Sequence, residues 1–294
     1  MSQRIFVTGA TGVLGRRVVP ALVGAGHAVT AVVRTEAKAS ATRAYGATPV
    51  QVDLFDRDAI RTAIADHDCV AHLATHIPSG SSAASKEAWH TNDTLRREAA
   101  TAIAGAVVDA GIGRMIQESI TFPYIDRGDQ WIDESCERVY GWVTESTVVA
   151  EAATASVTAA GGAGIVLRFA MFMAPDSAHM QRVLGAARRG VFGLLGTPNS
   201  YISFIHIDDA AAAVVAALEA PAGTYNVAEP DPVHRSNHGD VLASLAGRSG
   251  VLERPDVDAA TSTARSHRIS SQHLQHVSTW SPTIHCVDRW KELQ

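Results

Sequence analysis

The sequence predicts an α/β fold with a doubly wound parallel sheet and a small C-terminal substrate-binding lid. Up to about residue 170, short apolar runs rich in β-branched residues alternate with longer, Ala-rich amphipathic runs. A glycine-rich turn directly follows the first apolar run, and the last part of the chain is less regular. Strands that alternate with helices of this length form parallel sheets covered on both faces.

The period of the apolar residues places the elements in order. The first strands are expected at 5–7, 28–33 and 48–52, with helices over 13–23 and 59–65. The later strands are expected at 69–73, 114–117, 165–169 and 223–227, and the later helices at 87–110, at 144–160 and from 205–209 to Pro221. We expect Asp208 to cap the last helix, because its carboxylate can accept the unpaired amides of the first turn.

The pattern also predicts how the chain divides into domains. Residues 1–170 and 205–228 are expected to form the nucleotide-binding domain. Residues 171–204 and 229–294 are expected to form the small lid, which would sit beside the carboxyl ends of the strands. In open α/β sheets, ligands bind in the crevice at that edge.

Composition favours a small-molecule partner. The chain has 294 residues, with 25 Lys and Arg against 30 Asp and Glu, and a formal net charge of −5. No long basic run is present, so we expect no nucleic-acid or membrane partner. The three cysteines are widely separated, which suits a reducing compartment and predicts neither a disulfide framework nor a metal site. We find no leader sequence and no spanning apolar stretch, and therefore expect a cytoplasmic protein.

The glycine-rich turn predicts a dinucleotide site. Gly9, Gly12 and Gly15 follow an apolar strand and precede a helix. At this spacing the first glycine permits the tight turn, the second lets the backbone approach a pyrophosphate, and the third lets the helix pack closely on the sheet. The phosphates then face the amides and the positive dipole end of the helix. Thr11, Val13 and Leu14 complete the expected turn.

The end of the second strand indicates which dinucleotide binds. An acidic residue there would bind the ribose hydroxyls of NAD, but this strand ends in Arg34. A cation favours a 2′-phosphate, so we expect NADP in preference to NAD. Further cofactor contacts are expected at the ends of the third and fourth strands, from Asp53, Leu54, Leu73, Ala74 and Thr75.

With these residues, the chain resembles the extended short-chain dehydrogenase/reductase family, in its NAD-dependent epimerase/dehydratase group. The likeness covers nearly the whole chain and implies a Rossmann-type fold, a nicotinamide cofactor and a homodimer formed through the long fourth and fifth helices. The matching features are Thr8-Gly-Ala-Thr-Gly-x-x-Gly15, Asp53-Leu54, His72-Leu-Ala74, Asn92, Leu167-Arg-Phe169, His206-Ile-Asp-Asp209, Tyr225-Asn-Val227, and Trp280-Ser-Pro282 followed by Trp290.

The chain departs from this family at its acid–base motif. Relatives carry Tyr-x-x-x-Lys on the helix after the fifth strand, where the tyrosine exchanges the substrate proton. Aligned on Glu151, this chain has Val143 at the Tyr position and Thr147 at the Lys position. Neither side chain transfers protons at neutral pH. Tyr140 is the nearest tyrosine, and no cation follows it at one-turn spacing.

Candidate catalytic residues must therefore come from strand ends and the lid. Ser119, Tyr124, Glu118 and Tyr140 are the principal candidates. A carboxylate such as Glu118 at the end of a central strand is costly to bury unless it is paired or protonated, and such groups cluster at functional sites. Arg168, within a strand, is interpreted as the structural partner of a buried acid. Secondary candidates are Thr121, His76 and His179.

The expected substrate side is rich in apolar residues, which suits a small, rather apolar organic substrate better than a nucleotide-sugar. Packing between lid and sheet is the alternative explanation for these residues: Ile77, Phe122, Tyr124, Trp131, Trp142, Met171, Phe172, Met173 and Met180.

Three functions remain open at this point. The first is an atypical NAD(P)-dependent oxidoreductase or epimerase, in secondary metabolism. The second is a non-redox lyase, cyclase or isomerase on the same scaffold, acting through Glu118 or a histidine. The third is a catalytically depleted protein that binds NADP as a sensor. The fold alone cannot choose among them, because this scaffold hosts many chemistries.

Overall fold

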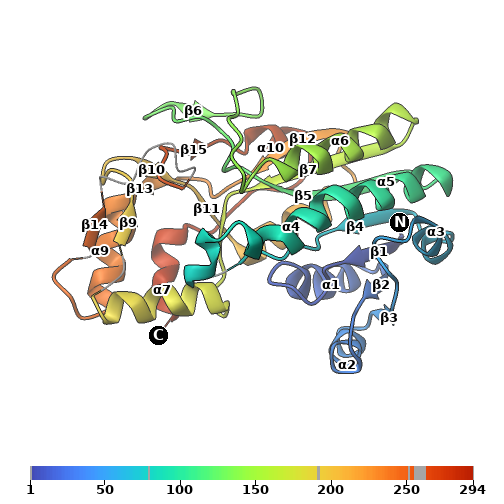
Figure 1. Cartoon of the computed structure of the whole chain (residues 1–294), viewed down its shortest axis with the longest axis horizontal. Coiled ribbons are helices and arrows are strands. Elements are labelled where there is room, and N and C mark those ends of the chain that lie inside the picture. The colour runs from blue at the N-terminus through green and yellow to red at the C-terminus, as the bar shows by residue number, and fades with distance from the viewer. Residues whose placement is uncertain (1, 79, 191–192, 251, 255–262, 294) are drawn as a thin grey trace.

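The computed structural model describes residues 2–78, 80–190, 193–250, 252–254 and 263–293. Within these ranges, seven strands form one parallel sheet in the order β12-β7-β5-β4-β1-β2-β3 (Figure 1). The strands are β1 (Arg4–Thr8), β2 (Ala28–Val32), β3 (Thr48–Val50), β4 (Cys69–His72), β5 (Arg114–Ile120), β7 (Ala163–Phe169) and β12 (Gly223–Val227). The predicted strands and the doubly wound parallel sheet are confirmed.

The strand order reverses beside β1. The chain runs outward from β1 to β2 and β3, and then returns to place β4 on the other side of β1. In register, Val7 of β1 lies between Ala31 of β2 and Ala71 of β4. The crossovers on the two sides of this point leave in opposite directions, so the sheet has a crevice at the carboxyl ends of β1 and β4.

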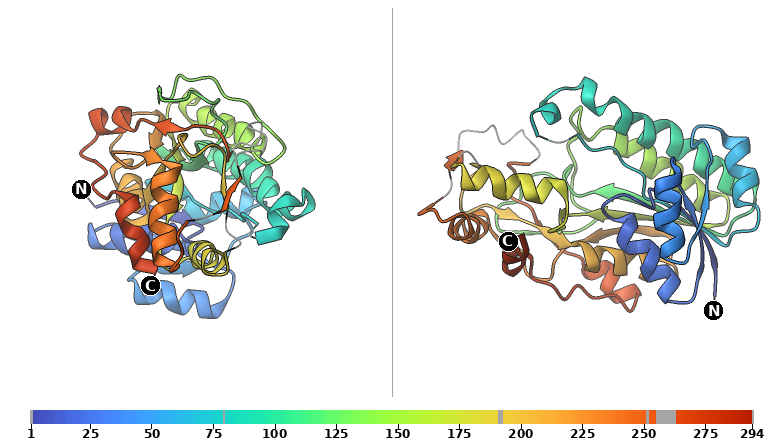
Figure 2. Two further views of the ribbon diagram at one scale, coloured as in Figure 1. Left: turned by 90° about the vertical axis from the view of Figure 1, so that its left-hand side faces the viewer. Right: turned by 90° about the horizontal axis from the view of Figure 1, so that it is seen from below.

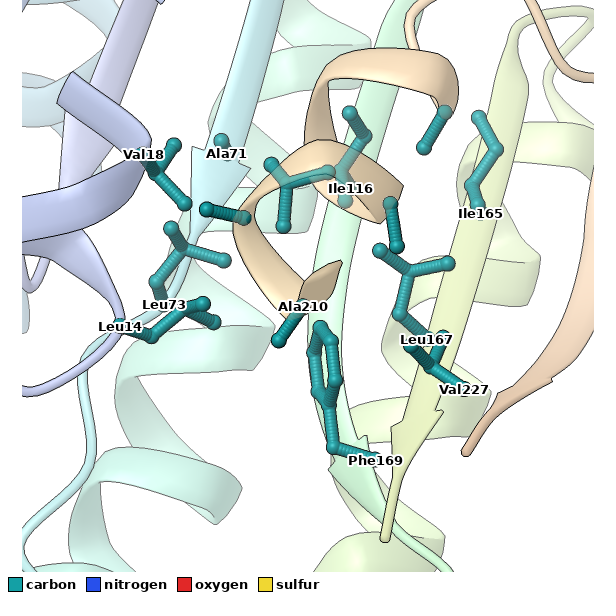
Figure 3. Close-up of a cluster of buried hydrophobic side chains, with 14 of the residues drawn as sticks. Leu14, Val18, Ala71, Leu73, Ile116, Ile165, Leu167, Phe169, Ala210 and Val227 are labelled. Atoms are coloured by element: carbon teal, nitrogen blue, oxygen red, sulfur yellow. The ribbon is translucent and has the colours of Figure 1, made fainter. Parts of the chain in front are cut away.

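Helices cover both faces of the sheet because its side chains alternate between them. The face that carries Ile5 and Val7 packs against α1 (Gly15–Gly24) and α8 (Ile207–Ala216), and Figure 3 shows this cluster around Ala210. The opposite face, which carries Phe6, packs against α3 (Arg57–Ile64), α5 (Ala100–Asp109) and α6 (Ser146–Ala159). Helix α2 (Glu36–Ala44) follows β2.

The long fourth helix is not uniform. It begins with the 3-10 turn η2 (Glu87–Trp89), continues as α4 (His90–Thr94), passes through the π-helical turn η3 (Leu95–Ala99) and ends as α5. The prediction of helix over 87–110 is therefore confirmed, with a π turn inside it that the period of apolar residues does not reveal. Turns of this kind are frequent at functional sites. No helix in the described ranges combines the length and apolarity needed to cross a membrane.

The expected cap of α8 is wrong. His206 occupies the cap position, and its ring Nδ1 accepts the Asp208 N–H at 3.3 Å. Asp208 lies inside the first turn, where its carboxylate pairs with Arg17 of α1 at 3.2 Å. The carboxylate thus links two neighbouring helices. The positive end of the α8 dipole also stabilises its negative charge.

The remaining elements gather at one end of the molecule, beside the carboxyl ends of the strands (Figures 1 and 2). A separate cluster of buried residues holds many of them together, and we call it the lid cluster because its members lie in the segments expected to form the lid: they include Met173, Met180, Leu184, Phe204 and Trp290. They are β8 (Met171–Met173), α7 (Ala178–Arg188), β9 (Gly193–Leu195), β10 (Tyr201–Ile202), β11 (Phe204–His206), β13 (Val233–His234), α9 (Arg235–Leu245), β14 (Leu252–Arg254), β15 (Arg268–Ile269) and the 3-10 turn η4 (Cys286–Leu293).

Three shorter elements complete the fold. The 3-10 turn η1 (Gly80–Ala84) precedes the long fourth helix, and β6 (Trp131–Ile132) pairs with β15. Helix α10 (Gln272–Val277) packs on β12, and its Leu274 belongs to the cluster under the main sheet rather than to the lid cluster. The proposed division into two domains remains a prediction.

Three buried histidines make the fold sensitive to acid. Burial lowers the pKa of His72, His238 and His267 from 6.5 to about 4. Below about pH 6.5 the unfolded chain binds these protons and the folded chain does not, so stability falls as the pH drops toward 4. Each histidine then costs on the order of 3 kcal/mol. Glu229 acts oppositely, because burial raises its pKa to about 7.

Glu118, whose pKa burial also raises, acts in the same direction as Glu229. Since these two carboxyls offset only part of the loss from the three histidines, we expect the free energy of unfolding to fall by a few kcal/mol between neutral pH and about pH 4.5. Urea denaturation at a series of pH values measures this. Replacing His238 by Gln should flatten the curve, whereas the same change at the exposed His90 should leave it unaltered. A stability that stays constant over this range would contradict the prediction.

Candidate functional site

A cavity of about 660 Å³ lies across the carboxyl ends of β3, β2, β1, β4 and β5. It occupies the crevice where the strand order reverses. Its lining is Gly9, Thr11, Gly12, Val13, Leu14, Val32, Val33, Arg34, Lys38, Val52, Asp53, Leu54, Phe55, Leu73, Ala74, Thr75, His76, Ile77, Thr91, Leu95, Glu118 and Phe172. With the exception of Gly15, the predicted cofactor-binding residues all lie in this lining.

The glycine turn forms the middle of the cavity. Each of its three positions requires glycine for a different steric reason. Gly9 has a φ of +68°, and a Cβ there would lie 2.5 Å from the Leu73 carbonyl oxygen. A Cβ at Gly15 would lie 2.2 Å from the Gly9 carbonyl oxygen, so Gly15 serves the packing of helix on strand. At Gly12 the nearest atom would be 3.2 Å away, and the space that a side chain would enter is the cavity.

The turn is suited to a phosphate group. Helix α1 begins at Gly15, and its cap residue Leu14 has no side chain that could bond the first amides. The Arg16 and Arg17 amides bond the carbonyl oxygens of Gly12 and Leu14, so the positive end of the helix dipole and the backbone amides before Arg16 meet this wall of the cavity. The residues present fit a pyrophosphate, because the glycine backbone leaves room for it and the helix terminus attracts negative charge.

Two cations stand at one end of the cavity. Arg34 follows β2, and Lys38 lies one turn further along in α2; both line the cavity. Sequence reasoning missed Lys38, although its place in the first turn of the helix that follows Arg34 was the available signal. Asp53 also lines this end, where its carboxylate accepts the Phe55 N–H at 3.0 Å.

The opposite end of the cavity contains Glu118 of β5, and this residue is 5% exposed. Its Oε1 accepts a hydrogen bond from Nη2 of Arg96 at 3.4 Å, and Arg96 is 1% exposed. Burial raises the pKa of Glu118, against the charge of Arg96. Oε2 of Glu118 and both Nε and Nη1 of Arg96 are buried with no hydrogen-bond partner within the described structure.

Arg96 was not predicted from the sequence. It lies in the π turn η3, next to Arg97, whose side chain is 40% exposed and pairs with Glu145. In a regular helical pattern these adjacent arginines look alike. The π turn changes the direction in which residues leave the helix, and this places Arg96 against Glu118.

Ser119 faces the other side of β5, away from the cavity lining. Its hydroxyl donates to Oε1 of Glu151 at 2.7 Å. Arg168 donates to both oxygens of the same carboxylate, at 2.9 and 2.7 Å, and Arg138 adds a further bond at 2.7 Å. Burial works to raise the pKa of Glu151, but these partners outweigh it and the net shift is downward. Arg168 thus meets an acid within the fold, as expected, and its structural role stays an interpretation.

Tyr124 is fully buried in the same network. Its hydroxyl accepts a hydrogen bond from Arg168 and donates to Asn226, both at 2.8 Å. Burial raises the pKa of Tyr124 to about 12. Tyr140 is half-buried, with the Arg138 guanidinium 5.6 Å from its ring centre. Of the four principal catalytic candidates, Glu118 alone lines the cavity.

The position that holds Tyr-x-x-x-Lys in relatives offers no proton donor here. Thr147 is buried, and its hydroxyl donates to the Thr144 carbonyl at 2.6 Å. Val143 is apolar and part of a turn. His76 does line the cavity, and its backbone N–H donates to the buried Asn92 Oδ1 at 3.0 Å.

The apolar residues expected on the substrate side divide between two places. Ile77 and Phe172 line the cavity. Met173 and Met180 are buried in the lid cluster, so core packing explains them. Trp131 is 45% exposed and lies 4.2 Å from the Arg268 guanidinium. The other members of the set, which do not belong to the lining, are Phe122, Tyr124, Trp142 and Met171.

Comparison with known proteins agrees with this geometry. The family model described as "NAD dependent epimerase/dehydratase family" matches residues 5–228. The chain is similar to a Streptomyces protein named 3-diazoavenalumate denitrifying reductase, with 34% identity over 248 residues, covering 78% of this chain and 77% of the relative. It is also similar to a Stigmatella aurantiaca protein named 4-hydroxy-2-methyl-3-oxo-4-farnesyl-3,4-dihydroquinoline-1-oxide ketoreductase, with 27% identity over 269 residues, covering 89% and 79%.

Among solved structures, the fold is similar to that of UDP-glucuronic acid 4-epimerase from Bacillus cereus, in complex with UDP-glucuronic acid and NAD. The TM-score is 0.75 and the identity 16%, and the match covers 98% of this chain and 97% of the other. At this identity the likeness establishes the fold of the chain.

Proposed function

The chain belongs to the NAD-dependent epimerase/dehydratase family, and on this premise we propose that it is an NADP-dependent reductase of a small, rather apolar organic substrate. It is an enzyme of the NAD(P)-dependent oxidoreductase or epimerase type. The finer assignment rests on one observation. A single cavity joins the glycine turn, the cations Arg34 and Lys38, and an apolar end that contains Glu118.

The sheet order gives the dinucleotide a direction. In this proposal Gly12 and the α1 terminus hold the pyrophosphate, and Arg34 with Lys38 holds the 2′-phosphate of the adenosine half. The nicotinamide then lies on the other side of β1, toward β4 and β5, where Glu118 stands. When bound, the reduced cofactor supplies a hydride. Three strand spacings, about 14 Å, separate the ends of β2 and β5, which leaves room for an extended ligand.

The substrate side supports an apolar acceptor. Ile77, Leu95 and Phe172 belong to the same cavity lining as Glu118, and a site for a nucleotide-sugar diphosphate would need cations on the substrate side. Both named relatives are reductases, one of a diazo compound and the other of a ketone on a farnesylated ring. We therefore propose reduction of an aromatic or lipophilic compound in secondary metabolism.

The first test is thermal stabilisation by NADP, NADPH, NAD and NADH in parallel. A ligand that binds only the folded state raises the melting temperature by mass action. We expect larger shifts with the phosphorylated pair. No shift with any of the four, in protein shown to be free of cofactor, would overturn the proposal.

Replacing Arg34 or Lys38 by Ala should weaken NADPH binding about tenfold and leave NADH binding unchanged, because a hydrogen bond to a charged group contributes about 1.5–3 kcal/mol. Calorimetric titration with each dinucleotide measures the ratio. Arg43→Ala is the matched control, since Arg43 lies on the same helix as Lys38, pairs with Glu36 at 2.7 Å and is not part of the lining. An equal loss for both dinucleotides would remove the two cations from phosphate selection.

A non-redox reaction at Glu118 is the second candidate, and the missing Tyr-x-x-x-Lys motif favours it. Such an enzyme would bind the dinucleotide without consuming it, so oxidation of NADPH during turnover separates the two functions. Homodimer formation stays a prediction. Val108 of α5 and Val148 of α6 are 39% and 44% exposed and would contribute to the expected helical interface.

A further inference from the structure

The carboxylate at the apolar end of the cavity points to the class of substrate. Hydride transfer to a ketone leaves an alkoxide, which needs a proton from a nearby acid. In this chain the usual donor position holds Val143 and Thr147, and Tyr124 is bonded inside the core by Arg168 and Asn226. Of the four principal candidates, Glu118 is the one that lines the cavity, where the secondary candidate His76 also lies, and it is an acid that Arg96 holds as half of an ion pair.

The pair is oriented relative to the cavity. Glu118 belongs to the lining and Arg96 does not, so the carboxylate lies on the cavity side of the guanidinium. Oε1 is bonded to Arg96, while Oε2 is buried with no partner in the described part of the chain. A buried polar atom without a partner is costly, and a ligand that approaches it regains that energy. The pair as a whole is neutral, and its negative end lies on the cavity side.

We propose that this site takes hydride acceptors that carry their own positive charge, such as aryl diazonium or iminium cations, and that the Glu118 carboxylate faces that charge. This inference rests on the proposed reductase function. In an apolar cavity, one carboxylate beside a cationic centre is worth far more than in water. Ile77, Leu95 and Phe172 would contact the apolar part of the same molecule.

Such acceptors need no proton. With a diazonium, the ring carbon gains a hydride from the dihydronicotinamide, the carbon–nitrogen bond breaks, and its electron pair leaves with dinitrogen. With an iminium, the carbon gains the hydride and the π electrons of the double bond move to nitrogen, which becomes a neutral amine. In both cases the positive charge ends on the oxidised nicotinamide. The absence of a tyrosine–lysine pair is then no defect.

The binding test uses a cation that cannot be reduced. Benzyltrimethylammonium and its neutral isostere, in which carbon replaces nitrogen, are titrated into the NADPH-loaded protein by calorimetry. We expect the cation to bind about tenfold more tightly. Glu118→Gln should remove that preference. Glu145→Gln is the control, because Glu145 is an exposed carboxylate paired with Arg97 on the surface.

A second variant separates a loss of cation binding from a loss of folding. Glu118→Gln leaves Arg96 buried without a carboxylate, whereas replacing both members by apolar residues, as in Arg96→Met with Glu118→Leu, is often neutral for stability. The double variant should keep its melting temperature and also lose the cation preference. A cation preference that survives in the folded double variant would overturn the inference.

The reaction test compares a dihydroisoquinolinium salt, an aryl diazonium salt and the ketone tetralone, each with NADPH deuterated at the transferred position. We expect deuterium on the product carbon of one or both cations, above the rate without enzyme, and none from tetralone. Comparing the two salts shows whether the site reduces an iminium cation, a diazonium cation or both. Faster reduction of tetralone would overturn the inference.

Two further outcomes are diagnostic. If Glu118→Gln changes the ratio of NADP to NADPH affinity and leaves probe binding unaltered, the carboxylate faces the cofactor ring and the inference fails. If the wild-type protein binds no dinucleotide at all, the proposed reductase function itself fails. Binding of NADPH without any preference for the cationic probe would refute the substrate class alone.

Discussion

Replacing Gly12 by Val is expected to lower the affinity for NADP and NADPH by about a hundredfold or more, or ~3 kcal/mol, while the protein stays folded. A Cβ at Gly12 meets only the Gly9 carbonyl oxygen, at 3.2 Å, so the turn needs only a slight adjustment. The added methyl groups would enter the cavity at the place where the phosphates must meet the α1 amides. At an NADPH concentration about a hundredfold above the wild-type Kd, most of the thermal stabilisation seen in the wild type would then be lost.

Neighbouring glycines provide the controls. A Cβ added at Gly24, at the end of α1, would have no neighbour within 4 Å among the residues that the structure describes, so Gly24→Ala should bind NADPH as the wild type does. Gly9→Ala should lower the melting temperature without any ligand, because its φ is +68° and its Cβ would lie 2.5 Å from Leu73. Retained NADPH binding in Gly12→Val would refute the placement of the phosphates.

Replacing Glu151 by Ala is expected to lower the free energy of unfolding by about 3–5 kcal/mol. The change removes four hydrogen bonds, from Ser119, Arg138 and, twice, Arg168. Arg168 is 4% exposed and would keep its charge without a counter-ion. This is a large part of the stability of an ordinary domain, and urea denaturation measures it.

Two comparisons make this prediction specific. Glu145→Ala, near the start of the same helix, breaks only an exposed pair with Arg97 and should cost less than about 1 kcal/mol. Because the folded-state pKa of Glu151 is lowered, its contribution is complete above the ordinary value of 4.5 and is lost as the pH falls through the folded value. A loss below about 1 kcal/mol for Glu151→Ala would show that the network does not stabilise the fold.

The sequence was sufficient for the fold and for most of the cofactor cavity, because both depend on local signals. The period of apolar residues located the strands, and the glycines mark a turn whose geometry permits few alternatives. The Gly9-to-Gly15 segment and Arg34 therefore lie where they were expected. The cofactor role of these residues remains a prediction that the Gly12 and Arg34 variants test.

The chemical end of the cavity could not be predicted in the same way. Ser119 and Glu118 are adjacent in sequence, yet one bonds Glu151 of α6 and the other meets Arg96. Which of two neighbouring strand residues faces the cavity depends on tertiary packing. Tyr124 was expected near the substrate, but its partner Asn226 is more than a hundred residues away in sequence and no local pattern links them.

The π turn Leu95–Ala99 allows one continuous helix to satisfy two neighbours at different angles. After the turn, α5 places Ile103 and Val107 in the core. Within the turn, Arg96 lies against Glu118. Each residue of an α-helix advances the chain by about 100° around the axis. Deleting a single amino acid from this turn, such as Glu98, would restore an even winding and swing Arg96 about a quarter-turn away from β5. An insertion of one codon at this place is thus enough to bring a guanidinium against Glu118, behind the cavity wall.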